Sequence, residues 1–249
     1  MALSRSPRGP DVGAGCQHRG VTEQPGYDVL ADAYDEAFPH GYVSPVERHA
    51  AATFAEELLA AGMAGPVVDV GCGTGHVAHD LAQRGLDVVG IDPSSGMLGH
   101  ARRRYPEQRW MVGDATLACL PDVALAGVVA RFSLIHVAPE LVPGLVAGWV
   151  ARLHPGALVL VAFQCAADGE PPVVEFDHTV ARAWRWHPDA MAALLEGAGL
   201  RERWRLVVQR DAVRRFADCH LLHRLPEQRP APVRGRGAGT GGSGRSREP

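Results

Sequence analysis

Three glycines occupy alternate positions in Gly71-Cys72-Gly73-Thr74-Gly75, and the acidic residue Asp69 stands two residues before them. A glycine has no Cβ atom, so a loop of this kind lets the backbone approach a ligand closely. A dinucleotide site requires the spacing GxGxxG, but its third glycine position is held here by His76. Asp69 would repel a pyrophosphate and attract an ammonium or a sulfonium. These residues therefore favour a cationic ligand over a dinucleotide.

Two more aspartates follow strand-like segments further along the chain. Asp92 lies in VVGIDPSSGML, at the place where an acidic residue accepts both hydroxyls of a ribose. Asp114 lies in WMVGDATLACLPD, where a short polar side chain can accept the adenine amino group. Met97 can lie against the adenine face. Each aspartate alone is more often a cap or turn former, but three acids at three successive strand ends together indicate an adenosine-containing ligand.

The elements that must position these residues alternate between strands and helices. Helical spacing covers residues 46–61, 76–83, 94–104, 139–153 and 188–198, and strand-like runs cover 66–70, 87–91, 110–112, 126–132, 157–163, 201–208 and 217–223. This alternation predicts an α/β fold with a doubly wound, parallel sheet covered by helices on both faces. In such a fold ligands bind at the carboxyl ends of the strands, where the glycines and aspartates lie.

The blocks VVDVGCGTGHVA, VVGIDPSSGML and VGDATLACLPD together resemble the class I S-adenosylmethionine-dependent methyltransferases, in particular their small-molecule branch. The resemblance continues through VVARFSLIHVAPELVPGLVAGWVARLHPGALVLVAFQ and RWHPDAMAALLEGAGLRERW, and it covers residues 27–225. It implies a Rossmann-like sheet of seven strands with the last one antiparallel, and S-adenosylmethionine as the cofactor.

The resemblance also assigns cofactor-binding roles to individual residues. Asp69 would hold the ammonium end, Gly71, Gly73 and Gly75 would lie beneath the methionine part, and Asp92 would take the ribose. The implied set around the adenine and the reaction centre also includes Cys72, Pro93, Met97, Asp114, Ala115, Arg131 and Phe132.

Candidates for the acceptor side come from three segments. The N-terminal YDVLADAYDEAF is similar to the family's N-terminal segment, and this resemblance implies that Tyr27 and Tyr34 belong to a lid over the cofactor. An equal alternative is that these rings anchor a helix to the core. The end of the fifth strand carries Gln164, and residues 165–186 carry His178 and Trp184. Core packing explains the tryptophans there as well as substrate binding does. We expect a wall for the methyl acceptor from these segments.

His136, just after the fourth strand, is the best candidate for a catalytic general base. A histidine there can titrate near neutral pH, and a base is needed when the nucleophile carries a proton of high pKa. The alternative is a histidine that packs or caps the following helix. Whether oxygen, nitrogen or carbon is methylated stays open, as does the oligomeric state.

Composition limits the other possibilities. The chain of 249 residues has a formal net charge of −3, no lysine, and no apolar run long enough for a membrane span. We expect a cytoplasmic protein that binds no nucleic acid and no membrane, with a small molecule as its acceptor. Its five cysteines lack paired spacing, and no acid-rich cluster suggests a metal, so we expect free thiols and no divalent metal.

We expect one methyltransferase domain over residues 23–225 between disordered tails at 1–22 and 226–249, whose compositions offer little to bury. Two rival functions remain. One is a protein that binds S-adenosylmethionine without methylating, as a cyclase, decarboxylase or regulatory subunit. The other, opposed by His76 and Asp69, is an NAD-dependent oxidoreductase.

Overall fold

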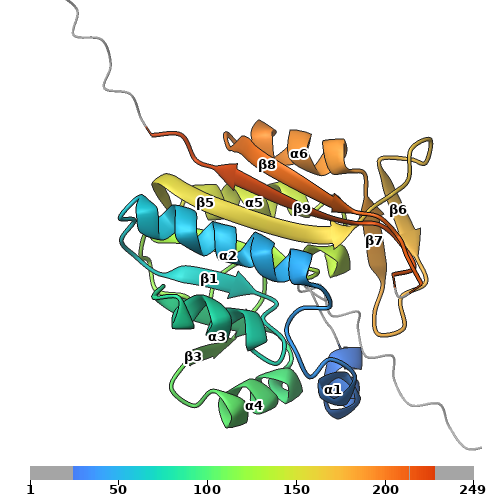
Figure 1. Cartoon of the computed structure of the whole chain (residues 1–249), viewed down its shortest axis with the longest axis horizontal. Helices are drawn as coiled ribbons and strands as arrows, with labels where there is room; N and C mark the ends of the chain where they lie inside the picture. The colour runs from blue at the N-terminus through green and yellow to red at the C-terminus, as the bar shows by residue number, and fades with distance from the viewer. Residues whose placement is uncertain (1–24, 213, 228–249) are drawn as a thin grey trace, which may run out of the picture.

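The computed structural model describes residues 25–212 and 214–227 of the chain, and its centre is a seven-stranded sheet of order β3-β2-β1-β4-β5-β9-β8 (Figure 1). The strands are β1 (Val67–Val70), β2 (Val88–Asp92), β3 (Arg109–Val112), β4 (Leu125–Arg131), β5 (Leu153–Gln164), β8 (Arg201–Val208) and β9 (Asp218–Arg224). Strands β1 to β5 pair in parallel, whereas β9 is antiparallel to β5 and β8. The predicted mostly parallel sheet with an antiparallel last strand is confirmed.

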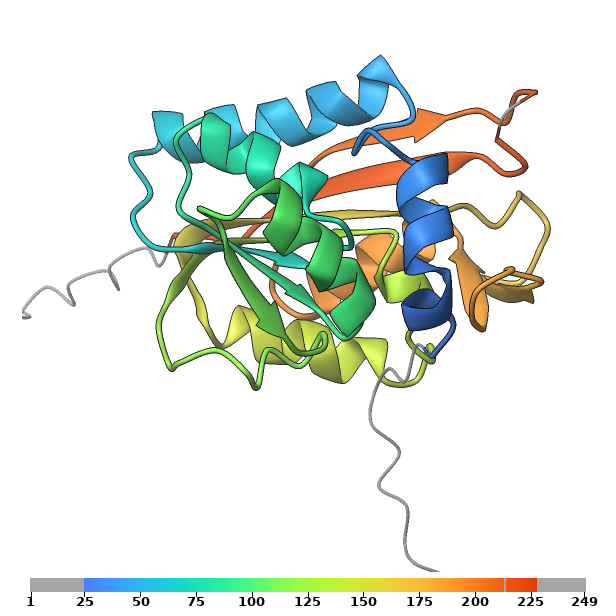
Figure 2. The same ribbon diagram turned by 90° about the horizontal axis from the view of Figure 1, so that it is seen from below.

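Helices cover both faces of this sheet. On one face lie α2 (Pro45–Ala60) and α3 (His76–Gln83), whose Phe54 and Leu81 belong to one apolar cluster with Leu158 of β5. On the other lie α5 (Val142–Val150) and α6 (Pro188–Gly197), and Figure 2 shows α2 and α5 on opposite sides of the sheet. All four residues of β1 are buried, as expected for a strand covered on both faces.

Of two further helices, one packs against β2 and β3, and the other lies near the carboxyl ends of the strands. Ser94 caps α4 (Ser95–Arg104), because its hydroxyl oxygen accepts a hydrogen bond from the backbone N–H of Met97. Helix α1 (Pro25–Ala37) packs against α4 rather than against the sheet (Figures 1 and 2). A short 3-10 turn, η1 (Leu134–His136), follows β4.

The predicted helix over residues 139–153 is wrong at both ends. Helix α5 is shorter, and Leu153 belongs to β5, where it pairs with Leu125 of β4. The dipeptide Pro155-Gly156 does not separate a helix from a strand. It forms an irregularity inside one long strand, where Gly156 adopts a φ of +88° and its N–H donates to the carbonyl of Leu225.

The segment 165–186 forms a second, two-stranded antiparallel sheet, which the sequence did not predict. Its strands are β6 (Val173–Phe176) and β7 (Ala183–Trp186). This hairpin stands beside the carboxyl end of β5 (Figure 1).

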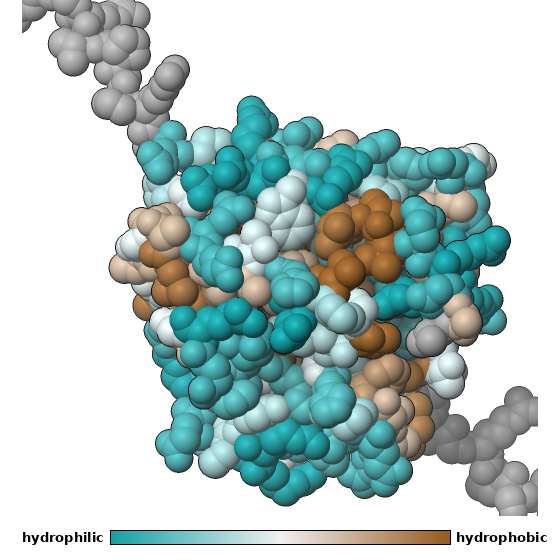
Figure 3. Space-filling view, in the orientation of Figure 1, coloured by the Kyte–Doolittle hydropathy of each residue, from teal (hydrophilic) through white to brown (hydrophobic). Residues whose placement is uncertain are grey.

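The surface in the view of Figure 3 is mainly hydrophilic, with an apolar area over β8 and β9, where Leu206 and Val207 of β8 are exposed. Among the helices that the structure describes, none is long and apolar enough to cross a membrane. The predicted tail 1–22 and all but the first two residues of the predicted tail 226–249 lie outside the described residues.

Candidate active site

A cavity of about 590 Å³ opens at the carboxyl ends of the central strands, where the sheet topology predicts a ligand. It brings together most of the predicted site residues: Tyr27, Tyr34, Asp69, Gly71, Cys72, Gly73, Asp92, Met97, Arg131, Phe132, His136, Gln164 and His178. A second cavity of about 330 Å³ lies at the opposite ends of the strands and contains none of the predicted residues.

The glycine loop needs its glycines for two different reasons. Gly71 has a φ of +70°, and a Cβ there would lie 2.4 Å from the Cβ of Ser133. Gly75 has a φ of +85°, and a Cβ there would lie 2.5 Å from the ring of Trp110, outside the cavity. At Gly73, by contrast, a Cβ would meet only the terminal methyl of Met97, at 3.2 Å, so this residue keeps the cavity open.

The carboxylates of Asp69 and Asp92 meet the cavity in contrasting environments. Asp92 accepts hydrogen bonds from the backbone N–H groups of Gly73, at 2.8 Å, and Ser94, at 2.9 Å. Asp69 is 2% exposed, and its Oδ2 atom has no hydrogen-bond partner. Burial, partly offset by the charge of Arg131, raises the pKa of Asp69 to about 7. Burial likewise raises the pKa of Asp92 to about 6. The orphaned oxygen calls for a positively charged donor.

Arg131 forms a buried ion pair at the end of β4. Its Nη2 lies 2.7 Å from Oε2 of Glu47 on α2, and both side chains are almost fully buried. Phe132 follows with a φ of +53°, which a phenylalanine rarely adopts, and turns the chain into η1. Arg131 is thus held by the protein itself.

His136 on η1 faces the cavity between two hydrogen bonds. Its Nδ1 lies 2.9 Å from the carbonyl oxygen of Arg182, and its Nε2 lies 3.0 Å from Oη of Tyr27. A carbonyl oxygen only accepts, so Nδ1 must carry the hydrogen and Nε2 of the neutral ring accepts from Tyr27. Burial, with a smaller effect of His178, lowers the pKa of His136 to about 4. The ring is therefore neutral at physiological pH.

Comparisons with known proteins agree with this geometry. Residues 67–156 match the methyltransferase domain family. The chain is 32% identical over 173 residues to dTDP-3-amino-3,4,6-trideoxy-alpha-D-glucopyranose N,N-dimethyltransferase of Streptomyces venezuelae. The aligned residues cover 64% of this chain and 68% of that protein. The chain belongs to the S-adenosylmethionine-dependent methyltransferases. Its cofactor is S-adenosylmethionine, and the similarity favours this function over the oxidoreductase considered above.

Two other proteins resemble this methyltransferase over longer spans. Demethylmenaquinone methyltransferase of Beutenbergia cavernae is 29% identical over 198 residues, which cover 68% of this chain and 78% of that protein. The structure of magnesium protoporphyrin IX methyltransferase from Synechocystis PCC 6803 with bound SAH superposes with a TM-score of 0.60 at 19% identity, covering 81% of this chain and 97% of that one. The latter similarity supports the fold.

Five of the predicted site residues do not line the cavity: Gly75, Pro93, Asp114, Ala115 and Trp184. The carboxylate of Asp114 accepts from the N–H and the hydroxyl of Thr116, at 2.9 and 2.5 Å, so it stabilises a turn. The carbonyl of Ala115 accepts from the indole N–H of Trp149 at 2.7 Å. The ring of Trp184 packs against the apolar core instead.

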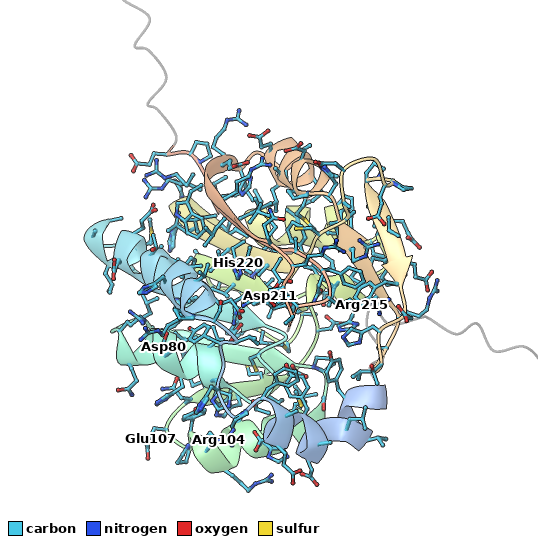
Figure 4. All side chains as sticks on the ribbon, turned by 45° about the vertical axis from the view of Figure 1, so that its right-hand side comes forward. Asp80, Arg104, Glu107, Asp211, Arg215 and His220 are labelled. Atoms are coloured by element: carbon cyan, nitrogen blue, oxygen red, sulfur yellow. The ribbon has the colours of Figure 1, made fainter. Side chains whose placement is uncertain are left out.

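Other lining residues were missed by the sequence analysis. Glu47 comes from α2, Arg214 and Phe216 come from the segment between β8 and β9, and Asp218 is the first residue of β9. Arg214 lies 3.2 Å from Asp218 and 3.8 Å from Glu47. Figure 4 labels Asp211 and Arg215 of the segment between β8 and β9, and Arg215 also lines the cavity. Arg214 and Asp218 are only four residues apart in the sequence, and the tertiary fold brings Glu47 of α2 to them.

Proposed function

We propose that this methyltransferase transfers the methyl group to a hydroxyl of a small molecule, with His136 as the proton acceptor. One observation carries the proposal: Nε2 of His136, buried and unprotonated, holds an O–H donor at 3.0 Å inside the cavity. The acceptor hydroxyl would take the position that the Tyr27 hydroxyl occupies here.

We assign the cofactor-binding roles from the same cavity. The orphaned Oδ2 atom of Asp69 would pair with the ammonium group of the methionine part, which restores the charge that burial disfavours. Asp92 would accept from the ribose hydroxyls, and Met97 would lie against the adenine. Gly73 leaves the space that the backbone needs to approach the methionine part.

Bound S-adenosylmethionine would supply a methyl group on a positively charged sulfur. The acceptor oxygen would bond to that carbon, the sulfur would leave with the electron pair of the broken bond, and the hydroxyl proton would be released. The hydrogen bond from Nδ1–H to the carbonyl oxygen of Arg182 fixes the orientation of the His136 ring. His136 would then take the hydroxyl proton at Nε2. Its low pKa is compatible with the role, because an oxygen that has bonded to the methyl group carries a strongly acidic proton. Desolvation of the cavity keeps the imidazole neutral and ready to accept.

A comparison of His136→Asn with Tyr27→Phe tests this proposal. We expect His136→Asn to lower kcat by about 10²–10⁴-fold, because the proton acceptor is lost, with little change in cofactor affinity. Tyr27→Phe should retain turnover within about fivefold, because its hydroxyl is displaced by the acceptor. The measurement is single-turnover kinetics with calorimetric titration of S-adenosylhomocysteine. Near-normal turnover in His136→Asn, or a loss in Tyr27→Phe as large as that in His136→Asn, would contradict the proposal.

A further inference from the structure

Seven aromatic rings line the cavity in one continuous chain, which we call the aromatic belt. The successive ring centroids lie 5.3, 5.7, 4.8, 5.4, 5.9 and 4.7 Å apart along Phe216, Phe176, His178, His136, Tyr27, Tyr34 and Phe38. The rings come from four separate places: the β8–β9 segment, the hairpin of β6 and β7, η1, and α1 with the residue after it. The belt thus surrounds the side of the cavity on which His136 lies.

The geometry of the belt favours a flat aromatic ligand. Every contact but that of Tyr34 with Phe38 is edge-to-face. The face of an aromatic ring carries partial negative charge and its edge carries partial positive charge. Rings packed edge to face therefore offer both faces and edges to a further aromatic ring. Burial lowers the pKa of both His136 and His178, so these two rings join the belt as neutral aromatic groups.

The charges on this side of the cavity are already paired. Among the described lining residues, Arg131 pairs with Glu47 at 2.7 Å, Arg214 with Asp218 at 3.2 Å, and Arg215 with Asp177 at 2.8 Å. Among the described carboxylates that line the cavity, only Asp69 and Asp92 form no ion pair with an arginine, and these are the two assigned to the cofactor. A charged acceptor would therefore find no unpaired countercharge beside the belt, and its desolvation would go uncompensated.

The cavity also offers one neutral polar group next to the belt. The Oε1 atom of Gln164, at the end of β5, is buried without a hydrogen-bond partner. As a carbonyl-type oxygen it accepts a hydrogen bond, so it suits a second donor on the same ligand.

We propose that the methyl acceptor is an uncharged, planar aromatic compound that the aromatic belt binds and whose hydroxyl is methylated. The inference rests on the proposed function. In the balanced step, the aromatic hydroxyl oxygen gains the methyl carbon, the sulfur keeps the electron pair of the broken bond, and the proton passes to Nε2 of His136. The product is an aromatic methyl ether with S-adenosylhomocysteine.

Calorimetry on the protein saturated with S-adenosylhomocysteine tests the inference without turnover. The probes are three aromatic hydroxyl compounds (2-naphthol, 1,3-dihydroxynaphthalene and 7-hydroxycoumarin), the saturated trans-2-decalol, and the anionic 2-naphthoate. We expect at least one aromatic hydroxyl probe to bind about tenfold or more tightly than trans-2-decalol and 2-naphthoate. Phe176→Leu should weaken that probe about three- to tenfold, and binding of S-adenosylhomocysteine should not change.

Trp184→Leu is the matched control, because its ring lies in the same hairpin but does not line the cavity. It should leave the affinity for the aromatic probe unchanged. The inference is overturned if trans-2-decalol or 2-naphthoate binds as tightly as the best aromatic hydroxyl probe, if Phe176→Leu has no effect, or if none of the three aromatic hydroxyl probes binds to the loaded protein. A protein that does not bind S-adenosylhomocysteine at all contradicts the proposed function itself, so the two failures are distinguishable.

Discussion

At the scale of single residues, Asp69 shows how a fold can bury a carboxylate whose hydrogen-bonding capacity is only partly used. Its carboxylate is buried at the end of β1, and one oxygen has no partner. The fold tolerates it because burial raises its pKa to about 7, so that near neutral pH a large fraction is protonated. In the proposed complex, the ammonium group of the cofactor would offset the cost of this burial.

Cofactor binding should therefore release protons. A bound ammonium favours the ionised carboxylate, so below pH 7 binding must expel the proton that Asp69 holds, whereas well above pH 7 there is none to expel. We expect a release approaching one proton per site from Asp69 at pH 6, which falls toward zero by pH 8.5. Calorimetry of S-adenosylmethionine in buffers of different ionisation enthalpy measures this number. Asp69→Asn is the control, and equal release by variant and parent would rule out the assignment.

Arg131 and Glu47 show a different use of buried charge. Their ion pair is almost fully buried, so removing one partner leaves an uncompensated charge inside the protein. We expect Glu47→Ala to lower the free energy of unfolding by about 3 kcal/mol, as measured by urea denaturation. Glu56→Ala, at an exposed position of the same helix, should change it by less than about 0.5 kcal/mol. Similar values for both would show that the pair does not support the fold.

The position of a residue in the cavity could be predicted from the sequence where it depends on a local strand end. Gly71 and Gly73 follow β1 and Asp92 ends β2, and all three line the cavity as their place after or at a strand end predicts. Asp114 has the same local setting, but its carboxylate is used by Thr116. Arg214 and Asp218 lie in the cavity only because β9 inserts beside β5, which no short motif records.

At the scale of elements, helix α1 is held to α4 by a row of polar contacts. Asp28, Asp32 and Asp35 lie on one face of α1, at spacings of four and three residues. Asp28 accepts from the N–H of Gly96 at 2.8 Å and from the hydroxyl of Ser94 at 2.7 Å. Asp35 forms a bidentate ion pair with Arg104, which Figure 4 labels on α4. These contacts place Tyr27 and Tyr34 over the cavity.

Breaking this row should loosen α1 without unfolding the sheet. In Asp28→Ala/Asp35→Ala we expect faster amide hydrogen exchange across residues 25–37 and weaker binding of S-adenosylhomocysteine, while the strands exchange as before. High salt should have a similar but smaller effect on the parent protein, because exposed ion pairs are screened. Asp122→Ala, at an exposed position before β4, is the control. Unchanged exchange in α1 would mean that apolar contacts hold it.

The long helix predicted over residues 139–153 shows why boundaries of elements are harder to predict than their existence. The apolar spacing of this segment fits a helix, but Leu153 pairs with Leu125 and both side chains belong to the core of the sheet. The hairpin of β6 and β7 was missed because its two strands are only four residues each and pair with one another rather than with the main sheet.

At the scale of the whole molecule, the arrangement separates two chemistries within one cavity. The carboxyl ends of β1 and β2 carry the acids and the glycine loop that the proposal assigns to a cationic, nucleoside-containing cofactor. The hairpin, η1, α1 and the β8–β9 segment carry the aromatic belt, to which the proposal assigns the methyl acceptor. The sheet topology was predictable because strands and helices alternate in the sequence. The composition of the acceptor side was not, because it is assembled from four distant segments.

The central claim is that the cavity holds S-adenosylmethionine with the ribose on Asp92, and a calorimetric titration of Asp92→Ala beside the parent protein tests it most directly. Hydrogen bonds to a charged group contribute about 1.5–3 kcal/mol, so the variant should bind S-adenosylmethionine about 10- to 150-fold more weakly. Its circular dichroism spectrum should match that of the parent. An unchanged affinity in a correctly folded variant would contradict the account, because the ribose would then lie elsewhere.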